Sequence, residues 1–394
     1  MYSNASLKMF FSKEKITSII KYDESLKLVL CFMIRFKLIV YILFGYSLLE
    51  EMNKQLIIEI IILLLAVSLS GCVDENQSQT PDESLTLQDT FNSKFGSLRG
   101  SFEELEEQSS LGIFWTRPHP GDAIWNEVEN TPGDYNWERL DDSIKIAHSL
   151  GVHPLITIWP FAEWDQNNCH SDLPVSPDPF GGILPERKGI PCDWQSYQNF
   201  LTVLMERYDG DGVDDMSDLA YPVNYFEIGN EPEMSGYNTF FQGTPSDYAL
   251  LLEKSAEAIK EANPDAKILH AGVASSANFS EDFWMEVFST VGIGDFFDIA
   301  NVHDLAVTDD GNVGFMKQLL EENNIFDKEI WVTEFRLYGG PGQEEVLDQD
   351  ALKERINSTF AAGAQKLFLL LPGYPEEMSE ELIIVLEEII SYHQ

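Results

Sequence analysis

Positively charged residues are scarce in this chain. Its 394 residues include 25 Lys and Arg against 66 Asp and Glu, which gives a formal net charge of −41. A protein that binds nucleic acid needs a basic face to meet the phosphate backbone, so this balance excludes nucleic acid as a partner. Apolar residues make up 44% and aromatic residues 12%, which is enough for a sizeable core. The composition fits a soluble protein that acts on a neutral ligand.

The few basic residues are unevenly placed. Residues 1–72 hold 8 basic and 6 acidic residues, whereas residues 73–394 hold 17 basic and 60 acidic ones. Two different kinds of segment therefore meet near position 72.

The segment 52–72 has the layout of a secretory signal. A Lys at position 54 precedes an apolar run at 60–69, and small residues lead to Cys72. The ending Leu-Ser-Gly-Cys is similar to the lipobox of prokaryotic lipoproteins. That resemblance implies a membrane lipid anchor at Cys72 and an exported protein, either a cell-surface lipoprotein or a secreted one. An uncleaved membrane anchor and a core helix are the alternatives, and Glu59 interrupts the apolar pattern.

We do not expect the segments on either side of this signal to belong to the folded domain. We predict that translation starts at Met52 and that residues 1–51 are a doubtful extension; a first transmembrane segment at 38–49 is the alternative. Residues 73–92 are rich in Asp, Glu, Gln, Ser and Thr, which predicts a disordered linker.

Cysteine is rare as well, with four in the chain. Cys31 and Cys72 lie in the N-terminal segments, and Cys169 and Cys192 flank a stretch rich in Pro and Gly. For an exported protein we predict a disulfide between the latter two. A metal site is the alternative, but two thiols and the nearby His170 fall short of four ligands.

From residue 93 onward, short apolar runs alternate with amphipathic stretches. We predict eight strands, at 95–99, 112–118, 152–159, 224–229, 267–273, 296–303, 329–335 and 366–372. A helix is predicted after each strand, at 101–110, 137–151, 194–208, 246–262, 280–291, 313–323, 349–362 and 379–392. Eight such units predict a (β/α)8 TIM barrel of the α/β class, a single catalytic domain over 93–394. A doubly wound sheet is the alternative, but the chain has no GxGxxG-like turn after its first strand.

Two of the predicted strands end in glutamate. Asn230 and Glu231 follow the fourth strand, and Glu334 lies near the end of the seventh, where barrels keep their catalytic groups. Alternation along the seventh strand puts Val332 and Glu334 on one face. One protonated and one ionised carboxyl group are what cleavage of a glycosidic bond requires. A solvated loop charge is the alternative for either Glu alone.

Over residues 93–394 the sequence resembles the clan A glycoside hydrolases, retaining glycosidases with a (β/α)8 barrel. The segments FEIGNEP and WVTEF carry the resemblance, which is nearest in motif to families 39 and 5. It implies that Glu231 is the acid/base and Glu334 the nucleophile. It also implies that Arg117, at the end of the second strand, keeps Glu334 ionised. A surface Arg is the alternative.

Further matches imply substrate-binding roles. Asn230 would hydrogen-bond the sugar 2-OH, and His303, at the end of strand six, matches a common active-site His; a satisfied core His is the alternative. Three Trp lie at or just past strand ends and are candidates for stacking on sugar faces, with core or rim packing as the alternative: Trp115, Trp159 and Trp164.

The sequence departs from the clan at two places. Leu305 stands where a Tyr often follows the strand-six His, and strand eight ends without the usual Trp, with only Tyr374 nearby. Glu227, deeper along strand four, is expected to be a paired structural charge. The run 209–215 has the Asp and Gly density of a calcium loop but lacks the twelve-residue pattern, so we favour a solvated loop and expect no metal or cofactor.

Taken together, these features predict a retaining glycoside hydrolase. It would cleave O-glycosidic bonds of β-linked oligo- or polysaccharide through a covalent glycosyl-enzyme intermediate. A sugar-binding lipoprotein with lost or weak catalysis and a transglycosylase are the alternatives.

Overall fold

The computed structural model describes residues 85–274, 278–337, 348–372 and 378–393. The predicted extension at 1–51, the signal at 52–72 with its lipobox Cys72, and Tyr374 lie outside the described residues. Contacts group residues 84–394 into one compact unit. Within the described residues, no helix combines the length and apolarity that a membrane span requires.

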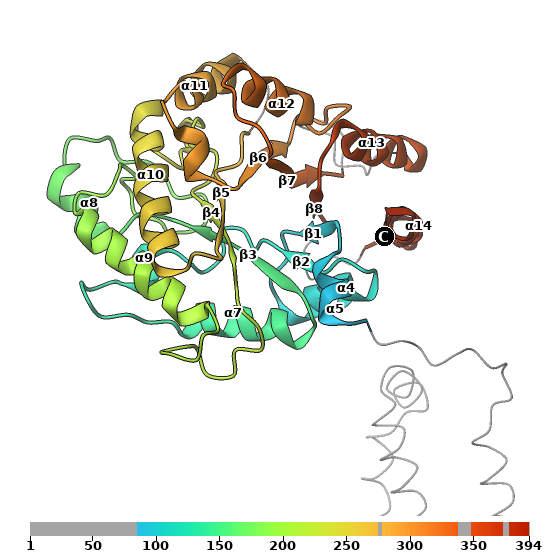
Figure 1. The fold of residues 1–394 in the computed structure, drawn as a ribbon, viewed down its shortest axis with the longest axis horizontal. Coiled ribbons are helices and arrows are strands. Elements are labelled where there is room, and N and C mark those ends of the chain that lie inside the picture. Colours follow the sequence, from blue (N-terminus) through green and yellow to red (C-terminus); the bar gives the residue numbers. More distant parts are fainter. Residues whose placement is uncertain (1–84, 275–277, 338–347, 373–377, 394) are drawn as a thin grey trace, which may run out of the picture. The chain divides into compact units, whose positions relative to one another are not determined.

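Eight parallel strands close into a barrel in sequence order, with β1 paired to both β2 and β8 (Figure 1). The strands are β1 Phe95–Ser97, β2 Trp115–Thr116, β3 His153–Ile158, β4 Tyr225–Ile228, β5 Lys267–His270, β6 Ile299–Asp304, β7 Glu329–Arg336 and β8 Lys366–Leu370. The predicted (β/α)8 barrel is therefore confirmed. Because the sheet is closed, no edge strand is left with unpaired backbone hydrogen-bonding groups. All eight strands are parallel, so their C-terminal ends lie at the same end of the barrel, its mouth.

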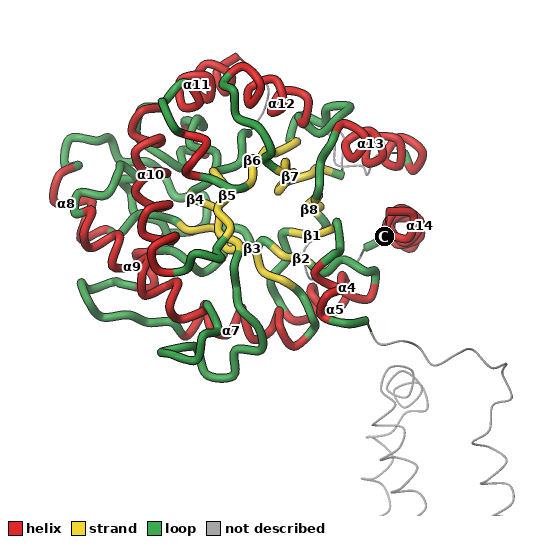
Figure 2. The backbone as a smooth tube through the Cα atoms, in the orientation of Figure 1, coloured by secondary structure: helices red, strands yellow, loops and turns green. Residues whose placement is uncertain are grey.

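Helices surround the strands (Figure 2). The main ones are α5 Phe102–Ser110, α7 Glu138–Ser149, α9 Trp194–Tyr208, α10 Pro245–Ala262, α11 Asn278–Phe288, α12 Val313–Glu322, α13 Gln349–Ala362 and α14 Glu380–His393. Shorter pieces are α4 Leu87–Phe91, α6 Trp125–Val128, α8 Glu163–Cys169, η2 Gly236–Asn238 and η3 Ile293–Phe296. Their buried faces cover the outside of the strands, which explains why the strands read as near-continuous apolar runs.

Side-chain caps fix where several helices begin. Ser101 accepts a hydrogen bond from the backbone N–H of Glu104, and the Glu104 carboxylate accepts one from the Ser101 N–H. Thr244 and Asp247 form the same box at the start of α10, where Pro245 occupies the first turn. Such boxes satisfy backbone donors that a helix start leaves free, so local sequence decides these boundaries.

The predicted disordered linker is wrong at its C-terminal end. Thr86 and Asp89 form a capping box that opens α4. The ring of Phe91 then packs 5.4 Å from Trp115 and 6.0 Å from Tyr225. This ring, together with the hydrogen bond between Thr90 and His153, joins the helix to the barrel, so the folded domain begins before residue 93.

An aromatic layer fills the barrel interior at the N-terminal end of the strands. Its buried members are Trp115, Leu155, Leu269, Ile299, Trp331 and Phe368. Gly96 is required there because a Cβ would lie 2.5 Å from the Phe368 ring. Trp115 is fully buried, and its indole N–H donates to the Phe91 carbonyl. The prediction that Trp115 stacks on sugar is therefore wrong, since it packs at the end opposite the barrel mouth.

A β-bulge alters the alternation along β7. Pairing with β6 passes from Val302 opposite Val332 directly to His303 opposite Glu334, so Thr333 is an extra residue. Val332 packs in the hydrophobic core, whereas Glu334 reaches the interior of the barrel mouth. The prediction that these two side chains share a face is wrong because the bulge re-aims Glu334.

Candidate active site

The fold brings the two predicted glutamates together at the barrel mouth. Glu231 follows β4 by three residues, and Glu334 lies in β7. One carboxylate oxygen of each residue and a ring nitrogen of His303 lie within 4.8 Å of one another. Glu231 is 4% exposed and Glu334 6%, so both carboxyl groups face a site that holds little water.

Arg117, directly after β2, connects the residues of this site. Its Nη1 donates to Oε1 of Glu334 at 2.9 Å, its Nε to Oε2 of Glu227 at 2.5 Å and its Nη2 to Oδ1 of Asn230 at 2.6 Å. The Arg117 side chain is fully buried. The predicted contact with Glu334 is confirmed, and a surface position for Arg117 is excluded.

Glu227 is the structural partner of Arg117, as predicted. Its Oε2 also accepts a hydrogen bond from the Thr157 hydroxyl at 2.7 Å, and its Oε1 accepts from Asn301 Nδ2 at 2.7 Å and Gly272 N at 3.2 Å. A buried charge pair is tolerable when its remaining lone pairs are satisfied in this way. The network therefore fixes the guanidinium against Glu334.

His303 connects Glu231 to the interior of the barrel. Its Nδ1 lies 2.7 Å from Oε1 of Glu231, and its Nε2 lies 3.1 Å from the Thr333 hydroxyl. That hydroxyl donates a hydrogen bond to Asn301 Oδ1 at 2.7 Å, so Thr333 accepts a hydrogen bond from Nε2–H of His303. The free tautomeric position is then Nδ1, which shares a proton with the Glu231 carboxyl group.

The two glutamates have pKa values moved in opposite directions. Burial would raise the pKa of Glu334, but positive charge on His303, His119 and Arg117 outweighs it and lowers that pKa to about 2. Burial also dominates at Glu231 and raises its pKa, against the opposing hydrogen bond from His303. When the pKa values of two neighbouring carboxyl groups shift in opposite directions, one group can hold a proton while the other is ionised.

The backbone at Glu231 is in an unusual conformation. Its φ is +38°, in the left-handed region that side-chain-bearing residues rarely adopt. The Glu231 carbonyl accepts a hydrogen bond from Met234 N at 3.0 Å, which closes a turn. A strained backbone at a site residue must be held by its surroundings, so the turn 231–234 is part of the site.

The comparisons with known proteins agree with this geometry. Residues 205–365 match the family model described as glycosyl hydrolase catalytic core. The resemblance to the clan A glycoside hydrolases is confirmed. No curated protein sequence is significantly similar to the chain.

Solved glycoside hydrolase structures share the fold. A glucosidase from Croceicoccus marinus is 14% identical with a TM-score of 0.54, and 76% of this chain covers 67% of it. A β-galactosidase from Marinomonas ef1 is 12% identical with a TM-score of 0.53, and the coverages are 76% and 59%. A family 39 glycoside hydrolase from Bacteroides cellulosilyticus WH2 is 16% identical with a TM-score of 0.50, and the coverages are 75% and 59%. The chain thus spans about three fifths to two thirds of these glycoside hydrolases.

Two of the predicted sugar-stacking Trp residues are held by contacts within the protein. Trp159 is fully buried and donates its indole N–H to the Pro120 carbonyl at 2.8 Å. With no exposed ring face, it cannot stack on a sugar, so that prediction is wrong. Trp164 is half-buried on α8, donates to the Glu129 carbonyl and packs 5.1 Å from the Trp125 ring, which is rim packing.

His119 belongs to the site although the sequence did not single it out. It lies two residues beyond Arg117, and its Nδ1 is 3.9 Å from Oε1 of Glu334. Burial lowers the pKa of His119 to about 4. Its place just past the end of β2 is the one sequence signal that could have identified it.

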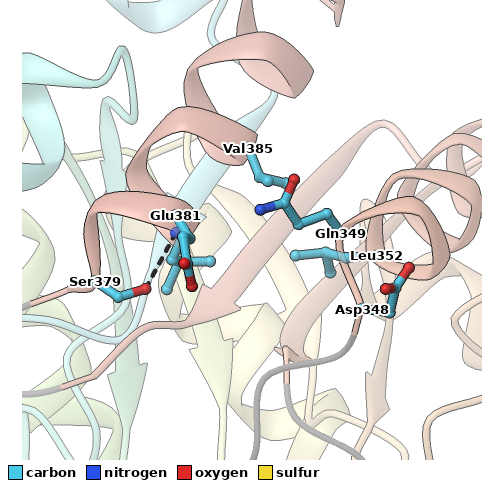
Figure 3. A pocket seen from close by; sticks show the side chains of 7 residues that line it. Asp348, Gln349, Leu352, Ser379, Glu381 and Val385 are labelled. Atoms are coloured by element: carbon cyan, nitrogen blue, oxygen red, sulfur yellow. Dashed lines mark hydrogen bonds between the residues drawn. The ribbon is translucent and has the colours of Figure 1, made fainter.

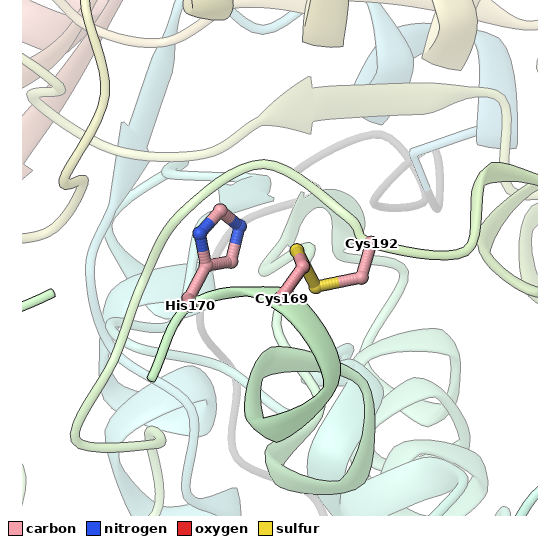
Figure 4. A group of neighbouring side chains, drawn as sticks. All are labelled: Cys169, His170 and Cys192. Carbon is pink, nitrogen blue, oxygen red and sulfur yellow. A yellow bond between two sulfur atoms is a disulfide. The ribbon is translucent and has the colours of Figure 1, made fainter. Parts of the chain in front are cut away.

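A disulfide closes the loop beside this histidine. Cys169 and Cys192 are bonded, as predicted, with an S–S distance of 2.02 Å (Figure 4). The nearby His170 places Nε2 2.7 Å from the Ile190 carbonyl, so the metal alternative is excluded. The closed loop carries Phe180, whose ring lies 4.9 Å from that of His119. The disulfide therefore orders an aromatic wall of the site.

The described residues offer few candidates for a bound cation. Oxygens of Asp209, Asp211 and Asp215 lie within 4.8 Å of one another, but Asp215 accepts hydrogen bonds from Gly210 N and Gly212 N in an exposed loop. Those bonds fit the predicted solvated loop. At the catalytic carboxyl groups, Arg117 already supplies the positive charge.

A separate hollow of about 230 Å³ lies between α13 and α14 (Figure 3). It is lined by Asp348, Gln349, Leu352, Ser379, Glu381, Leu382 and Val385. The Ser379 hydroxyl accepts a hydrogen bond from Leu382 N at 3.2 Å, which caps the first turn of α14. Its lining contains none of the candidate active-site residues, and its Ser379 and Asp348 side chains cap the starts of α14 and α13.

Proposed function

We propose that this chain is a retaining glycoside hydrolase that cleaves O-glycosidic bonds of β-linked oligo- or polysaccharide. The observation that carries the proposal is the approach of Glu231 and Glu334, whose carboxylate oxygens come within 4.8 Å. Retaining enzymes hold their carboxyl groups roughly 5–5.5 Å apart, and inverting enzymes need roughly 6.5–9.5 Å to admit a water. The 4.8 Å limit applies to the nearest oxygens of the pair, not to the carboxyl groups as wholes, and it supports the shorter separation of a retaining enzyme.

The residues divide the reaction between them. Glu231 donates a proton to the glycosidic oxygen while a Glu334 oxygen forms a bond to the anomeric carbon, and the leaving group departs as an alcohol. Glu231, now ionised, then takes a proton from water, whose oxygen displaces Glu334 from the sugar. Asn230 is held by Arg117 beside both groups, where its amide can meet the sugar 2-OH. The similarity to a β-galactosidase supports the β-linkage.

Substitution of the pair tests the proposal on a panel of aryl β-glycosides and β-linked polysaccharides. Glu334→Ala should abolish hydrolysis of every substrate, because no glycosyl-enzyme can form. Glu231→Ala should still form the intermediate from activated aryl glycosides, which need little acid assistance. Azide should then restore turnover and yield a β-glycosyl azide.

The alternatives predict other outcomes. Full activity in Glu334→Ala would refute the assignment, and an α-glycosyl azide would refute retention of configuration. Tight sugar binding without turnover by the unaltered protein would identify a sugar-binding protein. Products lengthened by acceptor sugars would identify a transglycosylase.

A further inference from the structure

Glu233 is a carboxyl group that the proposed reaction does not use. Its Oε1 accepts a hydrogen bond from Ala274 N at 2.7 Å. Its Oε2 is buried and has no hydrogen-bond partner in the described part of the chain. Burial raises the pKa of Glu233 to about 7, and the charge of Glu231 adds a smaller increase. The hydrogen bond from Ala274 N acts in the opposite direction. The side chain therefore changes charge near neutral pH, two residues from the acid/base.

Neutral groups face Glu233 from the neighbouring elements. On α11, the Trp284 indole N–H lies near enough to lower the pKa of Glu233, yet neither it nor the Ser280 hydroxyl forms a hydrogen bond within the described residues. From β5, the His270 ring packs 5.0 Å from Trp284, and burial lowers the pKa of His270 to about 4. From α10, Tyr248 packs against the same indole at 5.4 Å.

Within the described ranges, no cation compensates the Glu233 carboxyl group. Among the described residues, Glu233 forms no ion pair with Lys, Arg or His. The charged groups on the side toward the active site belong to Glu231, and beyond it to His303, Glu334 and Arg117. An ionised Glu233 thus adds an unpaired negative charge beside Glu231 in a poorly solvated region, where like charges interact strongly.

The contact with Ala274 also links the turn that carries Glu231 to the strand that carries His303. The preceding residue, Val273, bridges to Val302, and its carbonyl accepts a hydrogen bond from His303 N at 2.8 Å. Glu233 therefore fastens the turn of Glu231 to the strand end that holds His303. The positive φ of Glu231 needs such an external restraint.

We propose that Glu233 is a positioning residue for the acid/base: its bond to Ala274 holds the Glu231 turn, and its charge keeps the proton on Glu231. The inference rests on the proposed function for its catalytic consequence. An acid that must hold a proton while free enzyme meets substrate benefits from a neighbouring negative charge, because ionisation of Glu231 then places two like charges together.

Glu233→Gln in the full chain tests the proposal. Glutamine retains the shape and an oxygen for the Ala274 N–H but carries no charge. The basic limb of the pH profile of kcat/KM should move to lower pH by on the order of half a unit, while kcat at the optimum stays within about twofold. Glu129→Gln is the matched control, since Glu129 accepts from a backbone N–H, that of Gly133, and from the Trp125 indole. That variant should leave the profile unchanged.

A second measurement needs no substrate. The Glu231 carboxyl can be titrated by ¹³C NMR, with its signal assigned from Glu231→Gln, and its midpoint should fall in Glu233→Gln. An unchanged midpoint in the folded variant overturns the inference. If the unaltered protein hydrolyses no glycoside, the proposed function fails, and the titration still decides the role of Glu233.

Glu233→Asp carries the test if Glu233→Gln does not fold. Aspartate keeps the charge but is one methylene too short to reach the Ala274 N–H. The basic limb should stay near that of the unaltered enzyme, while kcat falls at every pH because the turn is no longer held. An unchanged kcat would overturn the positioning role.

Discussion

At the scale of single residues, Arg117 is the permanent charge of the site. Burial lowers the pKa of His119 to about 4, so that imidazole adds positive charge beside Glu334 only in acid and is neutral at physiological pH. The guanidinium of Arg117 cannot lose its proton in this range. Its bond to Glu334 and the cationic form of His303 therefore keep Glu334 ionised, as its proposed role as nucleophile requires.

Arg117→Gln should move the acidic limb of the kcat/KM profile to higher pH. Without the guanidinium, one of the charges that oppose burial is lost and the pKa of Glu334 rises from about 2, so the variant loses activity at a higher pH than the unaltered enzyme. The variant should also lose about 3–5 kcal/mol of unfolding free energy, because Glu227 is left as an unpaired buried charge. A pH–rate series and urea denaturation measure the two effects.

Arg207→Gln is the control for this experiment. Arg207 forms an ion pair with Asp141 at 2.6 Å, on the outer helices and away from the carboxyl pair. Its replacement should lower stability without moving either limb of the profile. An acidic limb that stays in place in folded Arg117→Gln would show that His303 and His119 ionise Glu334 without the guanidinium.

At the scale of elements, helix bounds that depend on local sequence could be predicted, whereas features that depend on packing between distant segments could not. Helix α9 has its predicted bounds, 194–208. The structure adds that the Asp193 side chain caps its first turn, which is also a local signal. The bulge at Thr333 carries no such signal, since Thr suits a regular strand as well. The carboxyl pair was found nonetheless, because strand ends were enough to place it.

Burial of aromatic side chains was the other limit of the sequence. Trp115 and Trp159 stand at strands just as a sugar-stacking Trp would, and both proved fully buried. The direction in which a Trp on a short strand such as β2 packs depends on the side chains around it. For Trp115 these include Phe91 and Trp331. Those neighbours come from distant parts of the chain.

The disulfide-closed loop yields a prediction at this scale. Replacing both Cys169 and Cys192 with Ala should lower the free energy of unfolding by about 2–4 kcal/mol, because the unfolded chain regains the freedom of the loop. Trypsin should also cleave faster after Lys188, whose buried amine bonds to Ser176 and the Pro177 carbonyl. Denaturation curves and timed digestion give the two readouts.

Reduction of the unaltered protein provides the control for that variant. Dithiothreitol should reproduce the faster cleavage in the unaltered protein and add nothing in the double variant. Equal cleavage rates in all four samples would mean that the loop is held by its hydrogen bonds alone.

At the scale of the whole molecule, the described barrel is strongly acidic and its catalytic mouth is not. Residues 73–394 hold 60 acidic and 17 basic residues, yet Arg117 and His303 set the charge around Glu334. A neutral sugar is not repelled by a negative surface, whereas a polyanionic substrate would be. The charge distribution therefore agrees with a neutral β-linked glycan as the substrate of the proposed function.

The signal-like segment before this barrel leads to the last prediction, on location. We propose that Cys72 carries a lipid that anchors the protein to a membrane, on the basis of the Leu-Ser-Gly-Cys ending after an apolar run. Expressed from Met52 in a bacterial host, the protein should partition with membranes. Cys72→Ala should release it or leave it unprocessed, because no thiol remains for lipidation. Cys31 precedes Met52, so this shorter protein lacks it and it cannot take the place of Cys72. Fractionation and the mass of the mature N-terminus decide the matter: a normally processed Cys72→Ala protein that still partitions with membranes would rule out the lipid anchor. The disulfide supports export from a different direction, since such bonds persist outside the cytosol.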